Sequence, residues 1–87
     1  MAGCDAHTFN GVTPEEFACI ARKAEQESGL TLSGNNGSAL APGISVNWNF
    51  DPASYTLTIQ CMDKPFLLPC ATINSQIRNL VDGCLGR

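Results

Sequence analysis

The chain has 87 residues, of which 44% are hydrophobic and 15% charged, and its net charge is -3. This length accommodates one domain with a core of marginal size and leaves no room for a second domain. The acidic balance, without any run of basic residues, provides no electrostatic surface for nucleic acid or an anionic membrane, so we predict neither as a partner.

The first twelve residues contain neither the basic start nor the apolar centre of a secretory signal, and no stretch reaches membrane-spanning length. We therefore expect residues 1–12 to be a flexible N-terminal segment and residues 13–87 to form the single domain. These features predict a soluble chain, with the cytoplasm favoured over the periplasm or the outside of the cell. A chain from which an export signal had been removed would show the same features.

The first predicted element is a helix between Thr13 and Gly29. Thr13 is a capping residue, Pro14 fits the first turn, and Glu16 completes a capping box. Gly29 provides the stop signal. Small and apolar residues recur at helical spacing and predict one narrow buried stripe. The stripe comprises Phe17, Ile20, Ala21, Ala24 and Ser28.

A short strand over residues 30–32 and a connection over residues 33–43 are expected to follow this helix. The connection is rich in Gly, Asn, Ser and Ala and has no periodicity of its own. It lacks the lysine and the strand-to-helix context of a phosphate-binding loop. We therefore interpret it as a linker.

The segment from Ile44 to Cys61 predicts an antiparallel hairpin around a turn at residues 51–54. Hydrophobic and polar residues alternate on both sides of this turn, as in strands with one buried face. Pro52, at the second position of this turn, favours a reversal of the chain direction. The predicted register pairs Phe50 with Tyr55, Trp48 with Leu57, Val46 with Ile59 and Ile44 with Cys61, and all eight side chains face inward.

A second helix is predicted from about Cys70 to Asp82, ended by Gly83. Its apolar side comprises Ile73, Ile77, Leu80, Val81 and Cys84. A two-stranded hairpin alone is marginal in water and needs a cover for its apolar face. The sequence therefore predicts an α+β two-layer sandwich in the order helix, β-hairpin, helix, with or without one extra short strand, in which both helices cover one face of a small antiparallel sheet.

The five cysteines are the only intrinsically reactive side chains that recur, and all are candidates for a disulfide or a reactive thiol. Cys61, Cys70 and Cys84 are expected to face the core as unreactive thiols. Cys19 is expected on the solvent side of the first helix, and Cys4 is expected in the flexible segment. From there Cys4 is free to pair with Cys19 or with another chain. If the core is oxidised, the expected cross-link joins Cys61 to Cys70 or to Cys84, because all three face one core.

No arrangement of residues indicates a catalytic, cofactor or metal site. His7 is the only histidine, and the spacing Cys4-x-x-His7 supplies only two ligands in a segment expected to be flexible. No Ser/His/Asp arrangement, P-loop or dinucleotide fingerprint occurs. The sequence therefore predicts no enzymatic activity and implies no cofactor.

The outward side of the predicted hairpin is the candidate interface. It carries uncharged hydrogen-bonding side chains, from Ser45, Asn47, Asn49, Thr56, Thr58 and Gln60. Lysine and glutamate, which commonly prevent an exposed strand edge from pairing with another chain, are absent from both strands. We predict an oligomerising or partner-binding module, with a homodimer or another protein as partner and a small polar ligand as a further option. The alternatives are a thiol redox or thiol-switch protein, and a small disulfide-stabilised secreted or periplasmic domain.

Overall fold

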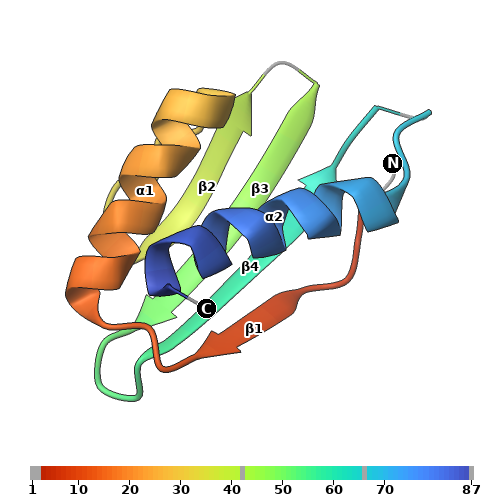
Figure 1. Ribbon diagram of the computed structural model, residues 1–87. Helices are drawn as coiled ribbons and strands as arrows, with labels where there is room; N and C mark the ends of the chain where they lie inside the picture. Colours follow the sequence, from red (N-terminus) through yellow and green to blue (C-terminus); the bar gives the residue numbers. More distant parts are fainter. Residues whose placement is uncertain (1–2, 42, 66, 87) are drawn as a thin grey trace.

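The computed structural model describes residues 3–41, 43–65 and 67–86. Its elements, in chain order, are β1 (His7–Asn10), α1 (Pro14–Ser28), β2 (Asn36–Ala41), β3 (Ile44–Asp51), β4 (Thr56–Asp63) and α2 (Cys70–Leu85). The strands form one four-stranded antiparallel sheet in the order β1-β4-β3-β2. Both helices lie on the same face of this sheet (Figure 1), which confirms the predicted two-layer α+β sandwich.

Helix α1 begins and ends where its sequence signals place it. The Thr13 hydroxyl accepts a hydrogen bond from the Glu16 backbone N–H at 3.2 Å, and the Glu16 carboxylate accepts one from the Thr13 N–H at 2.9 Å. Gly29 ends the helix in the left-handed conformation, with φ of 74°. Three residues of the predicted stripe, Phe17, Ile20 and Ala24, are buried.

The hairpin faces are as predicted, but its register is wrong by two residues. Phe50 lies opposite Leu57 and Trp48 opposite Ile59, so that the loop comprises residues 52–55. A slip of two preserves the alternation between faces, and the inward side chains from Ile44 to Phe50 and from Leu57 to Cys61 are buried or half-buried. Tyr55 is the exception: it closes the loop with a positive φ of 56° and its side chain is 48% exposed.

Two strands form where the sequence indicated none. β1 lies within the segment expected to be flexible and pairs with β4. β2 lies within the expected linker, whereas the predicted strand at residues 30–32 does not form. The indole of Trp48 explains the small residues of β2. A Cβ on Gly37 would lie 3.3 Å from the Trp48 ring, whose N–H donates to the Gly34 carbonyl at 3.1 Å.

The core lies between the sheet and the two helices. The rings of Phe17 on α1 and Phe50 on β3 stack with centroids 4.6 Å apart. Val81 on α2 is fully buried in the same cluster. Helix α2 is longer than predicted because it continues through Gly83 and ends only at Gly86, which has φ of 72°.

Candidate functional site

The outer sheet face is the face of the sheet opposite α1 and α2. All six predicted interface residues lie on it, on β3 and β4. The strand register adds the outward residues of β1 and β2, namely Thr8, Asn10, Asn36, Ser38 and Leu40. None of these eleven side chains is charged. The sequence could not supply the five added residues, because β1 and β2 were not predicted.

Hydrogen bonds between neighbouring strands order the polar side chains of the outer sheet face. The Ser38 hydroxyl on β2 donates to the Asn47 side-chain oxygen on β3 at 2.6 Å. The hydroxyls of Thr8 on β1 and Thr58 on β4 are 3.4 Å apart. A shallow depression of about 120 Å³ lies between β3 and β4, next to Asn47 and Thr58. One apolar side chain accompanies this polar surface, because Leu40 is 77% exposed.

The cysteines pair differently from the predicted cross-link. Cys4 is bonded to Cys70, and Cys19 is bonded to Cys84. Cys61 is the free cysteine. The expectation of a solvent-facing Cys19 is wrong because α1 and α2 pack against each other along that side of α1, where Cys19 is half-buried. Cys4 is buried, because the segment before β1 runs beside β4.

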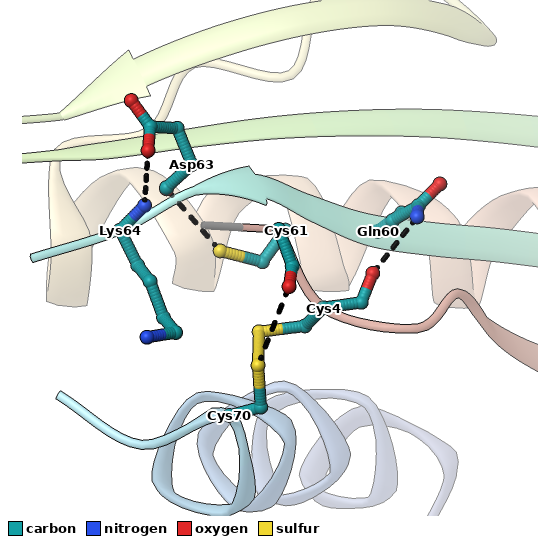
Figure 2. The surroundings of a disulfide bond; sticks show 7 residues. Cys4, Gln60, Cys61, Asp63, Lys64 and Cys70 are labelled. Atoms are coloured by element: carbon teal, nitrogen blue, oxygen red, sulfur yellow. Dashed lines mark hydrogen bonds between the residues drawn. A yellow bond between two sulfur atoms is a disulfide. The ribbon is translucent and has the colours of Figure 1, made fainter. Parts of the chain in front are cut away.

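The free thiol of Cys61 lies beside the first of these disulfides, in one small cluster with Cys4 and Ile73. Its Sγ donates to the carbonyl of Asp63, and the Gln60 side chain donates to the Cys4 carbonyl at 2.8 Å (Figure 2). The Cys61 side chain is fully buried. Burial raises the pKa of this thiol above its ordinary value of 9.0, which opposes the formation of a reactive thiolate.

A groove of about 510 Å³ lies between the two helices, on the inner side of the sheet, and we call it the inter-helix groove. The floor and walls are mostly aliphatic, and the rim is polar. The lining residues are Lys23, Glu27, Ser28, Leu30, Ile44, Val46, Ile73, Gln76, Ile77, Asn79 and Leu80. Sequence reasoning missed this groove, because it depends on the angle at which α1 and α2 cross the sheet (Figure 1).

His7, the histidine considered as a metal ligand, lies in the sheet and not in a flexible segment. His7 lies on β1 and stacks on Phe9 with ring centroids 6.1 Å apart. Within residues 3–41, 43–65 and 67–86, no three His, Cys, Asp or Glu side chains are grouped in a way that could hold a metal ion. In the same part of the chain, no helix has the length and apolar character needed to cross a lipid bilayer.

The fold and its cross-links define a small two-layer α+β domain in which two disulfides tie α2 to the first part of the chain. We compared the sequence and the fold with those of known proteins, and none of the comparisons found a match. No protein-family model matches the sequence, no curated protein matches it, and no solved structure matches the fold.

Proposed function

We propose that this chain is a non-catalytic binding module that contacts a protein partner, in the first place a second copy of itself, through the outer sheet face. The main support for this proposal is that the outer sheet face is uncharged and is not covered by either helix. Both helices lie on the opposite side of the sheet. Uncharged polar side chains cost far less to remove from water than charged ones, so this surface is suited to burial against another protein.

The size of the face supports a modest interface. The strands β1 to β4 contain four, six, eight and eight residues. At about 3.3 Å per residue and about 4.8 Å between strands, they present roughly 400 Å². Two such faces bury roughly 800 Å² in total, which is the size of a weak, transient interface and not of a stable one. The exposed Leu40 at the β2 edge adds apolar area next to this surface. We therefore expect a reversible dimer and not an obligate one.

A charge placed at the centre of the outer sheet face tests this proposal. Asn47→Arg should weaken self-association at least about tenfold, because an unpaired charge buried in an interface costs well over the free energy of a tenfold change. Sedimentation equilibrium of the wild type and variant over a wide concentration range measures the dissociation constant. Gln26→Arg adds the same charge on the exposed side of α1 and should leave the constant unchanged.

Two results would contradict the proposed dimer. A wild-type chain that remains monomeric at the highest attainable concentration would rule out self-association. A dimer that Asn47→Arg and Gln26→Arg weaken equally would place the contact elsewhere. A small polar ligand at the depression beside Asn47 and Thr58 is the alternative occupant, and it predicts a monomer that binds sugars or amides.

The two disulfides favour an oxidising compartment as the place where the module works. Four of the five cysteines are paired. Disulfides persist in the periplasm and outside the cell, whereas cytosolic thiols are kept reduced. We therefore propose a disulfide-stabilised periplasmic or secreted domain, in preference to the cytoplasmic location that the sequence favoured. The thiol-switch alternative has less support, because burial of Cys61 opposes thiolate formation.

A further inference from the structure

The inter-helix groove has the size and lining of a small-molecule site. Ligand pockets typically enclose about 300–1,000 Å³ and combine apolar walls with a few polar groups. The volume here is about 510 Å³, and aliphatic side chains from β3 and α2, including Ile44, Ile77 and Leu80, line it. These side chains are only half-buried. An apolar ligand body would therefore cover apolar surface that the fold leaves in contact with water.

Helix geometry fixes where this groove is closed. The Cys19–Cys84 disulfide holds α1 and α2 together, and the helices diverge from there over β2 and β3 (Figure 1). Lys23 lies one helical turn after Cys19, and Gly83 directly precedes Cys84. A Cβ on Gly83 would lie 2.9 Å from the Lys23 Nζ. The absence of a side chain at Gly83 therefore makes room for the ammonium group at the closed end of the groove.

The charges at the groove favour an anion at this closed end. Lys23 is half-buried, and no ion pair or hydrogen bond of its ammonium occurs within the described chain. Glu27 also lines the groove, one turn nearer the C-terminus of α1, but its side chain is exposed to water. A counter-charge stabilises a charged group in contact with apolar surface more than it stabilises a fully solvated one, because the local dielectric constant is lower. Of the two charged side chains at the groove, Lys23 is therefore the one that a counter-charge stabilises more.

We infer that the inter-helix groove binds a small amphiphile with an aliphatic body and one carboxylate, of the medium-chain fatty acid type. The carboxylate pairs with the Lys23 ammonium, and the aliphatic body lies along Ile44, Ile77 and Leu80 towards the open end. This site is on the inner side of the sheet, opposite the outer sheet face. Ligand binding therefore does not depend on the proposed dimer.

Calorimetric titration with decanoate, below the concentration at which it forms micelles, tests the site. Each methylene transferred from water into the groove should raise affinity about threefold to fourfold, so hexanoate and octanoate should bind progressively more weakly than decanoate. Decanol, which lacks the charge, should bind the wild type about tenfold more weakly than decanoate. Methyl chemical shifts of Ile44, Ile77 and Leu80 should change on saturation.

Substitutions at the closed end separate recognition from folding. Lys23→Met keeps an apolar stem of similar length and should abolish the preference for decanoate over decanol. Gly83→Ala retains Lys23 but places a methyl group against its Nζ, and should reduce the same preference while α2 remains intact. Glu27→Gln is the matched control on α1 and should leave decanoate binding unchanged or tighter.

The inference is overturned by any of four results. Wild-type protein that shows no saturable binding of decanoate has no such site. Equal affinity for decanoate and decanol, or a preference that Lys23→Met leaves unchanged, removes the role of the ammonium group. Chemical-shift changes confined to β3 and β4 residues of the outer sheet face would place the ligand on the opposite side of the sheet.

Discussion

At the scale of single residues, Cys61 links burial to a pH dependence of stability. Burial raises the pKa of its thiol above 9.0 in the folded chain. The folded state therefore holds the proton more tightly than the unfolded state, by about 1.4 kcal/mol for each pKa unit. This contribution is fully present below the unfolded-state pKa near 9.0 and is lost as the pH rises through the folded-state pKa.

We expect the free energy of unfolding of the wild type to fall more steeply above pH 9.0 than that of Cys61→Ala. The variant should also be about 1 kcal/mol less stable at neutral pH, because the site is fully buried and the sulfur atom is lost. Urea denaturation on both sides of pH 9.0 measures the slope of stability against pH for each protein, and the difference between the two slopes isolates the contribution of Cys61. Parallel pH profiles would show that the thiol does not contribute.

An alkylating reagent gives an independent check of the same side chain. With the disulfides intact, Cys61 should react only when the chain unfolds, because its thiol is buried and poorly ionised at neutral pH. Mass spectrometry should find no label on the native protein and one label after denaturation. Rapid labelling of the native chain would instead support the thiol-switch alternative.

At the scale of the elements, the capping box of α1 is a local device whose contribution can be measured. Thr13→Ala should destabilise the protein by about 1 kcal/mol, because the Glu16 N–H loses its acceptor at the helix start. Thermal denaturation should show a fall in Tm of roughly 4–8 °C for a chain of this size. Glu16→Gln keeps an oxygen acceptor for the Thr13 N–H and should have a smaller effect. A Tm of Thr13→Ala equal to that of the wild type would contradict the prediction.

Local signals explain which elements could be predicted from the sequence. The cap and stop of α1 lie within the helix itself, and alternation fixes the buried face of β3 and β4. β2 carries no such signal, because its inward residues are small: Gly37 leaves room for the Trp48 ring, and Ala39 is buried in the core. The register of the hairpin depends on Tyr55, which adopts a positive φ that its residue type does not announce.

The candidate sites were less predictable than the elements, because they depend on contacts between residues that are distant in the sequence and not on local signals. Alternation placed Asn47 and Thr58 on the outer sheet face, as the structure shows. The inter-helix groove needs residues from both helices and β3, and only the packing of the whole domain brings them together. The disulfide partners depend in turn on which sides of α1 and α2 meet, so the sequence could not pair Cys19 with Cys84.

At the scale of the whole molecule, the disulfides compensate for the small size of the core. Cys4–Cys70 and Cys19–Cys84 connect residues 66 and 65 positions apart, so both attach α2 to the first part of the chain. In the chain-entropy description, a cross-link that closes a loop of this length stabilises the folded state by about 4 kcal/mol. The second adds less, because the first already restricts the unfolded chain.

Removal of the disulfides should therefore decide whether this domain folds at all. A domain typically has only about 5–15 kcal/mol of stability, so one double variant, Cys19→Ala/Cys84→Ala, should fold with a clearly lowered urea midpoint. Removing all four paired cysteines should leave a largely unfolded chain at physiological temperature. Circular dichroism measures both, and Cys61→Ala is the control that keeps both cross-links. A fully reduced chain that unfolds at the same urea concentration as the oxidised one would show that the core alone holds the fold, and would remove the argument for an oxidising compartment.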